Sequence, residues 1–209
     1  RGVGAPHTPV IPGEQPHFKR ILVIRPNNRL GNLLLITPLL QELENTFPGC
    51  KIDVFVRGGL APVLFKNYPA LDRVIMLPGK PFKQLVSYAR AWLKLKGRKY
   101  DLAINVIPES SSGRLATKFS RSRHKIFGNV RAEAADRHVA RMVVNNFREF
   151  MALFGVDRSG NAIPSPGIKL SAAEIAQGKA LLSSYAAGGL PVISVFTYAT
   201  AEKLLPAAW

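Results

Sequence analysis

One segment near the amino end of the chain constrains the fold more than any other part of the sequence. It runs from Arg20 to Pro38 and reads RILVIRPNNRLGNLLLITP. Its apolar, β-branched start at 21–25 predicts a buried strand. A polar turn with Gly31 follows, and an apolar helix begins near Asn32. A strand, a tight turn and a helix start in this order direct free backbone N–H groups at the space beyond the strand.

The same turn carries positive charge that favours one kind of ligand. Arg25 and Arg29 lie beside the free N–H groups, so we expect an anionic or polyhydroxylated ligand. A strand–turn–helix unit is, however, a common component of α/β folds, and the glycine spacing matches neither the dinucleotide fingerprint nor the phosphate-binding loop. A binding loop and a purely structural turn therefore both remain open, although ligands of open α/β sheets favour the carboxyl ends of strands.

Strands and helices alternate along most of the chain. The predicted strands cover 21–25, 51–57, 73–77, 100–107 and 125–127. The predicted helices cover 32–46, 60–67, 82–96 and 138–154, and a serine-rich turn at 110–113 opens one more. This rhythm predicts an α/β fold, in which a Rossmann-like parallel sheet is flanked by helices on both faces.

The domain organisation is expected to have four parts. They are a flexible leader, a Rossmann-like domain, a linker rich in Gly, Pro and Ser, and the start of a second α/β domain, over 1–19, 20–156, 157–167 and 168–209. After the short segment 168–170, the last part is predicted to contain a helix at 172–185 with Ser171 as its N-cap and a strand at 192–196. These elements cannot bury their apolar faces alone, so we expect the second domain to be cut short.

Charge and cysteine usage limit the class of partner. The formal net charge is +16, from 29 Lys+Arg against 13 Asp+Glu, which indicates an acidic partner such as nucleic acid, an anionic membrane surface or a phosphorylated substrate. A single cysteine, Cys50, excludes an internal disulfide and fits a reducing compartment. No apolar run approaches the roughly 18 to 20 residues that span a bilayer.

Several motifs, in order, resemble one family of enzymes. The segment from Ile21 to Leu40 with Phe47-Pro48 and KIDVFV after it is similar to the start of glycosyltransferase family 9, the lipopolysaccharide heptosyltransferases and their relatives. YDLAIN, ending at Asn105, is similar to a later strand of that family, and His138 opens a long helix ending in LFGV as in the family. PVISVF and KLLP, beginning at Lys203, resemble its first donor-domain strand and its K-x-W-P segment.

The resemblance implies a two-domain bacterial enzyme of the GT-B type. The first domain would hold the acceptor, a lipopolysaccharide-type or other glycan, and the second would bind a nucleotide-activated sugar such as a heptose. Transfer in this family inverts the anomeric centre and needs no metal or other cofactor, because the nucleotide-sugar is itself a substrate. The resemblance further implies that this sequence lacks most of the donor domain.

The identity of the catalytic base is the main departure from the family. The family places an Asp directly after the loop glycine, and here that residue is Asn32, whose amide takes no proton but can orient a hydroxyl. Asn105 likewise stands where many relatives carry Asp. Three explanations stay open: a subgroup with another base, a displaced base such as Glu109, or an inactive acceptor-binding protein. Glu109 follows a predicted strand and is equally readable as a solvated loop charge.

The remaining candidate residues divide between acceptor and donor. The acceptor candidates are the charged, amide, glycine and hydroxyl groups that follow the predicted strands: Arg25, Asn28, Arg29, Gly31, Asn105, Ser110, Ser111 and Arg114. A serine turn that caps a helix explains the last three nearly as well. On the donor side, Lys203 resembles the family lysine that contacts donor phosphate, with Thr197 and Thr200 in the same loop.

Basic residues gather around the helix predicted at 82–96, where they interleave with an apolar stripe. Such a helix either packs on the sheet with its cations solvated or lies on an anionic membrane. A glycolipid acceptor favours a cytoplasmic protein that associates peripherally with the inner face of the inner membrane. Nucleic-acid binding is the rival from another class, but the sequence resembles no nucleic-acid module, so none is expected.

Overall fold

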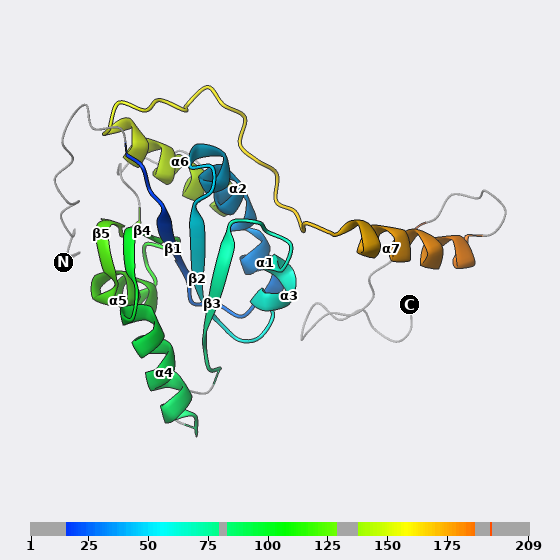
Figure 1. Cartoon of the computed structure of the whole chain (residues 1–209), viewed down its shortest axis with the longest axis horizontal. Helices are drawn as coiled ribbons and strands as arrows, with labels where there is room; N and C mark the ends of the chain where they lie inside the picture. The colour runs from blue at the N-terminus through cyan, green and yellow to red at the C-terminus, as the bar shows by residue number, and fades with distance from the viewer. Residues whose placement is uncertain (1–15, 80–82, 129–137, 187–192, 194–209) are drawn as a thin grey trace, which may run out of the picture. The chain divides into compact units, whose positions relative to one another are not determined.

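The computed structural model describes residues 16–79, 83–128, 138–186 and 193 (Figure 1). The chain forms two compact units, Arg1–Lys169 and Leu170–Trp209. The predicted residues Thr197, Thr200 and Lys203, and the predicted strand at 192–196 apart from residue 193, lie outside the described residues. Within the described residues, no helix is both long enough and apolar enough to cross a membrane.

The first unit is built on a five-stranded parallel sheet, which confirms the predicted α/β class. The strands are β1 (Arg20–Arg25), β2 (Lys51–Arg57), β3 (Leu71–Leu77), β4 (Lys99–Asn105) and β5 (Arg121–Ile126). Their order in the sheet is β3-β2-β1-β4-β5, and every neighbouring pair is parallel. The central position of β1 explains its nearly continuous apolar sequence, because a parallel strand covered on both faces is buried all round.

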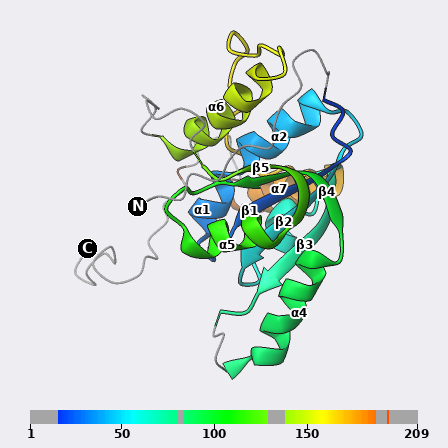
Figure 2. The same cartoon turned by 90° about the vertical axis from the view of Figure 1, so that its left-hand side faces the viewer.

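Helices cover both faces of the sheet (Figures 1 and 2). They are α1 (Leu30–Leu34), α2 (Thr37–Thr46), α3 (Ala61–Phe65), α4 (Leu85–Lys96), α5 (Ser111–Phe119) and α6 (Val139–Ala152). Ile21 and Val23 of β1 enter a core with α1, α2, α3 and α6, whereas Leu22 and Ile24 enter a second core with α4 and α5. The alternation of side chains along β1 therefore supplies both layers.

The single helix predicted at 32–46 is wrong, because two helices, α1 and α2, share this segment. Pro38 lies in the first turn of α2, where a proline has no N–H to give to the carbonyl of Leu34. The hydroxyl of Thr37 donates to that carbonyl instead, across 2.7 Å. The break therefore follows from the chemistry of the Thr-Pro pair.

Several strand boundaries also differ from the prediction, and for β4 and β5 the reason is clear. The β4 strand ends at Asn105 rather than 107, because the Asn105 amide then donates to the backbone carbonyls of Ile107 and Phe127. The β5 strand is twice as long as predicted, since it is an edge strand whose polar residues alternate with buried ones. His124 is one of the buried ones and packs against Phe18 and Phe154.

The segment predicted as a linker at 157–167 is part of the first unit and is bonded to α2 and α6. Glu42 of α2 is buried and pairs with Arg148 of α6 and with Arg158 of this segment. Arg148 also donates to the carbonyls of Asn161 and Ala162, so the segment is tied to α6. A buried carboxylate with two guanidinium partners is stable only in this closed arrangement.

The segment at 167–170 is held by side chains and is not part of the sheet. Tyr68 Oη donates to the carbonyl of Gly167, and Asn67 Nδ2 donates to the carbonyl of Lys169. In the second unit, α7 (Ala172–Tyr185) confirms the predicted helix with its predicted boundaries. Ser171 and Glu174 form a capping box at its start.

Candidate functional site

The strand order places a topological switch point between β1 and β4. The chain moves from β1 to β2 and β3 on one side, then crosses back to β4 on the other side of β1. Ile24 of β1 is level with Asn105 of β4, and the N–H of Val106 donates to the Ile24 carbonyl. The loops that follow β1 and β4 therefore leave the sheet side by side. This is the edge at which open α/β sheets bind ligands, and it carries the predicted Asn32 and Glu109.

The loop after β1 is organised by Asn27, a residue that sequence reasoning did not single out. Its Oδ1 accepts a hydrogen bond from the N–H of Arg29 at 2.8 Å and another from Asn32 Nδ2 at 3.0 Å. Its own carbonyl accepts from the N–H of Arg57 in the neighbouring loop. The Pro-Asn pair, typical of a local Asn turn, is the sequence signal that could have identified it.

The amide of Asn32 is consequently held by the loop. Asn32 is half-buried in the first turn of α1, which begins two residues earlier than predicted, so Asn32 is not an N-cap. Its Nδ2 is engaged by Asn27, which leaves the Oδ1 oxygen as the group that can accept from a hydroxyl. Asn32 can therefore orient a ligand hydroxyl that donates a hydrogen bond to its Oδ1, but an amide cannot remove the proton of that hydroxyl.

Arg25 supplies a buried positive charge at the end of β1. Arg25 is 8% exposed, and its Nε is buried and has no hydrogen-bond partner among the residues that the structure describes. Burial lowers the pKa of its guanidinium. A cation that is removed from water without a carboxylate partner is costly, and a bound anion would offset that cost.

The other candidates in the β1 loop lie at the surface. Asn28, Arg29 and Gly31 are exposed. A Cβ placed on Gly31 would have nothing within 4 Å, so packing does not require a glycine there. Gly58, at the end of β2, does need to be glycine, because its φ is +77° and an added Cβ would lie 3.0 Å from the Cβ of Asn28.

Asn105 is a structural clamp at the end of β4. It is 2% exposed, and both of its amide donor bonds go to the backbone, to Ile107 at 2.7 Å and Phe127 at 3.0 Å. Its Oδ1 is buried against Gly113, where an added Cβ would be 2.2 Å away. An Asp at this position would point a carboxylate at two carbonyl oxygens, which explains the amide here.

The loop after β4 presents an acid and hydroxyls at the same edge. Ser110 is the N-cap of α5 and accepts from the N–H of Gly113 at 3.1 Å, so its structural role is established. Glu109 and Ser111 are exposed beside it, and Arg114 is half-buried. Among the described residues, Glu109 is the carboxylate that this loop offers at the switch point.

A cluster of buried and half-buried charges lies in the α4 layer of the sheet, where buried Asp53 pairs with Arg73 and accepts from Tyr100 Oη at 2.8 Å. Burial and the neighbouring Asp53 raise the pKa of Tyr100, and the hydrogen bond from Arg98 lowers the pKa of Asp72. These groups satisfy one another and hold β2, β3 and β4 together. Among the described residues, no group of His, Cys, Asp and Glu side chains could hold a metal ion.

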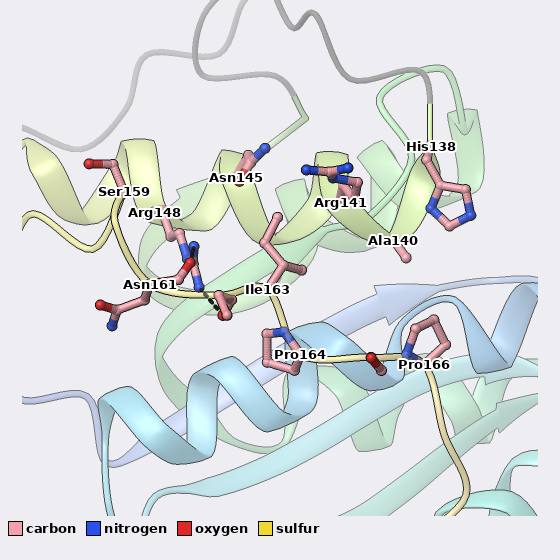
Figure 3. Close-up of a pocket in the computed structure, with 12 residues that line it drawn as sticks. His138, Ala140, Arg141, Asn145, Arg148, Ser159, Asn161, Ile163, Pro164 and Pro166 are labelled. Carbon is pink, nitrogen blue, oxygen red and sulfur yellow. Dashed lines mark hydrogen bonds between the residues drawn. The ribbon is translucent and has the colours of Figure 1, made fainter.

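An open groove of about 750 Å³ lies elsewhere, between α6 and the segment at 159–166 (Figure 3). Its most prominent cation, Arg148, is already bound to Glu42 and to two backbone carbonyls. The groove is on the outer side of the helical layer and not at the switch point. We therefore place the candidate site at the β1 and β4 loops, where groups capable of chemistry converge.

Comparison with known proteins supports the same assignment of the fold. No protein-family model matches the chain. Over 79 residues, 36% of this chain and 23% of the relative, it is 29% identical to lipopolysaccharide heptosyltransferase 3 of Escherichia coli. The chain thus spans about a quarter of the length of that curated relative.

Two solved structures share the fold. A glycosyl transferase family 9 structure from Veillonella parvula matches 85% of this chain with a TM-score of 0.64 and 18% identity, using 52% of its own length. The E. coli ADP-heptose lps heptosyltransferase II matches 78% of this chain with a TM-score of 0.55 and 17% identity, using 50% of its own length. The chain is therefore similar in structure and in sequence to the glycosyltransferase family 9 heptosyltransferases, over about half of the solved chains, and its sheet matches the GT-B N-terminal domain.

Proposed function

We propose that this chain is the acceptor-binding part of a glycosyltransferase that moves a heptose or related sugar from a nucleoside-diphosphate donor to a lipopolysaccharide-type or other glycan. The observation that carries the proposal is the meeting of the Asn32 loop and the Glu109 loop at the switch point, on a fold similar to heptosyltransferases. The names of the similar proteins, one of which includes ADP-heptose, support this choice of sugar and nucleotide.

The proposed reaction is a single inverting displacement without a metal. The acceptor hydroxyl attacks the anomeric carbon of the donor sugar, the bond from that carbon to the nucleoside diphosphate breaks, and the diphosphate leaves with the electron pair. Asn32 Oδ1 orients the hydroxyl, and Glu109 takes its proton. Arg25 and Arg29 hold an anionic group of the acceptor, and the proposed donor contacts are Thr197, Thr200 and Lys203.

A second function, acceptor binding without turnover, is favoured by one specific observation. The side chain at the position of the family base is an amide, and its Nδ2 is locked onto Asn27. The site then positions a glycan but lacks a base next to the hydroxyl. Both functions place the protein in the cytoplasm, where nucleotide-sugars are made available, and at the inner membrane surface when the acceptor is a glycolipid. Neither requires nucleic acid.

Release of ADP from ADP-heptose, with heptose-deficient lipopolysaccharide core as acceptor, distinguishes the two. In a two-domain protein that joins this chain to a donor-binding domain, we expect ADP to be released only when acceptor is present, and Glu109→Gln to lower kcat by roughly a hundredfold or more. Asp157→Asn is the matched control, since Asp157 is an acid outside the site, and it should leave the rate unchanged. Acceptor binding by the parent with no ADP release, together with ADP release by Asn32→Asp, would establish the binding protein instead.

A further inference from the structure

The helix α4 exposes an apolar face that the part of the chain described by the structure leaves uncovered. Leu85, Val86 and Leu93 are 64%, 65% and 68% exposed, although they belong to a regular helix beside the sheet. The helix buries only Ala91 and Leu95. Large apolar side chains exposed together on one element, unlike single scattered ones, indicate a contact surface.

The helical period puts these residues on one side. At 100° per residue, Leu85, Val86 and Leu93 fall within a sector of about 100°. Ala89 and Lys96 lie inside this sector, and Lys96 Nζ lies over the ring of Phe119 in α5. The sheet-facing side is a different sector, which holds Ala91 and Leu95 with the partly buried Tyr88 and Trp92. The apolar side chains of α4 thus form two groups, and the half that contains Leu85, Val86 and Leu93 is mostly exposed.

Positive charge borders the uncovered half. Arg90 and Lys94 follow the apolar sector around the helix, and Lys83 precedes its first turn. From Lys83 to Lys96 the chain contains no Asp or Glu, and none of these three cations pairs with a carboxylate in the described part of the chain. An apolar stripe bordered by unpaired cations, without acids, is the pattern of a helix that lies in the interface of an anionic bilayer.

The position of α4 matches this role. Because α4 follows β3, it begins at the carboxyl edge of the sheet, the edge that carries the candidate site. In both views its first turns extend beyond the strands (Figures 1 and 2). The exposed end can therefore reach a flat surface while the site opens on the same edge.

We propose that this surface, the α4 face, binds an anionic phospholipid bilayer, and we define it by Leu85, Val86, Ala89 and Leu93 with Lys83, Arg90 and Lys94. The leucines and the valine enter the boundary of the acyl chains, and the cations contact lipid phosphates. Duplex DNA offers the same phosphates but nothing for the apolar residues. The glycolipid setting rests on the proposed function, whereas binding to lipid does not.

Co-sedimentation with vesicles tests the proposal without any sugar donor or acceptor. The 209-residue chain should bind vesicles of phosphatidylcholine with phosphatidylglycerol, and bind pure phosphatidylcholine far less. Leu85→Ser and Leu93→Ser should each weaken binding about tenfold, because each removes an apolar side chain from the bilayer. Arg90→Gln and Lys94→Gln should each weaken it about fivefold, and added salt should reduce the difference.

Matched controls distinguish binding by the α4 face from non-specific binding by other exposed apolar or cationic residues. Val63→Ser removes a side chain that is 69% exposed on α3, and Lys179→Gln removes an exposed cation on α7. Both should bind as the parent does. All of these positions are exposed, so thermal unfolding monitored by circular dichroism should be unchanged.

Three outcomes would overturn the proposal. The first is unchanged vesicle binding by the double variant Leu85→Ser with Leu93→Ser. The second is retention on duplex DNA at physiological salt that is as strong as retention on anionic vesicles. The third is a dimer that light scattering detects in the parent and not in this double variant. The last result would make the α4 face an interface between copies. If the chain binds vesicles but a two-domain protein that contains it transfers no sugar, only the proposed reaction would be refuted.

Discussion

Asn32 donates its amide hydrogen to Asn27 Oδ1 across 3.0 Å, and Asn27 Oδ1 accepts the N–H of Arg29 as well. One oxygen therefore fixes both the turn and the side chain at the position where the similar enzymes are expected to hold their base. The loop is built around an amide at residue 32. This relationship makes the effect of a carboxylate there predictable.

Asn32→Asp should destabilise the protein at neutral pH and less so in acid. The carboxylate would face the Asn27 oxygen without a donor, so we expect the free energy of unfolding to fall by about 1–2 kcal/mol. Below about pH 4 the protonated group can donate again, and the loss should shrink. Chemical denaturation of the parent and the variant at pH 7 and pH 4 measures this difference in the free energy of unfolding. An equal loss at both pH values would show that the Asn27 contact is not the cause.

Arg25→Met tests the buried cation. Because the guanidinium is buried without an acid, its replacement by an apolar side chain should leave stability within about 1 kcal/mol of the parent or raise it. Pyrophosphate should raise the melting temperature of the parent more than chloride does at equal ionic strength, and this difference should vanish in the variant. The exposed Lys179→Gln variant should keep the difference. A variant that loses several kcal/mol would instead identify Arg25 as a structural residue.

Gly31→Ala separates packing from ligand approach. A Cβ at Gly31 has open space around it within α1, so the alanine should stabilise the fold by about 0.5–1 kcal/mol. If acceptor lies against this turn, the same methyl group should weaken its binding, which isothermal titration calorimetry with a lipopolysaccharide core glycan measures. Gly178→Ala in α7, which also has open space, is the control and should change stability only. Unchanged acceptor binding by Gly31→Ala would place the acceptor elsewhere.

The thiol of Cys50 should make stability depend on alkaline pH. Burial raises its pKa from an ordinary value of 9.0 to about 11. Between pH 9 and about pH 11 the thiol loses its proton in the unfolded chain and keeps it in the folded chain, so the unfolded state is favoured as pH rises. The parent should therefore lose more stability between pH 9 and 11 than Cys50→Ala does. Iodoacetamide should modify the folded parent slowly at pH 8, and rapid modification would show that the thiol is accessible.

Local patterns were sufficient for much of the fold. The strand at 51–57, the helix at 172–185 and the alternation of elements were predicted from hydrophobic runs, turns and caps. The break between α1 and α2 was missed, although Thr37 and Pro38 carry it, because an apolar run dominates that segment. The side-chain bonds that hold the segment at 167–170 were not predicted, since its partners, Asn67 and Tyr68, are about a hundred residues away in the chain.

The candidate site shows the same division. The residue types at its rim, Arg25, Asn32 and Glu109, were visible because they follow predicted strands. Asn105 clamps two backbone turns through bonds that depend partly on the placement of a neighbouring loop, so its role could not be predicted. Asn27 acts through bonds within its own loop, and the Pro-Asn pair that signals this role was overlooked. The family resemblance contributed the expected chemistry, and the coordinates supplied the neighbours of each group.

The amino-acid sequence by itself determined the order and type of the main elements, the buried character of β1, and the positive charge and glycine of its loop. These properties depend on side chains that are close together in the chain. Only the tertiary structure decided which loops meet, which polar groups are already satisfied, and that half of the α4 apolar surface is left uncovered. Such properties depend on strand order and register, which bring distant residues together and which no local pattern records.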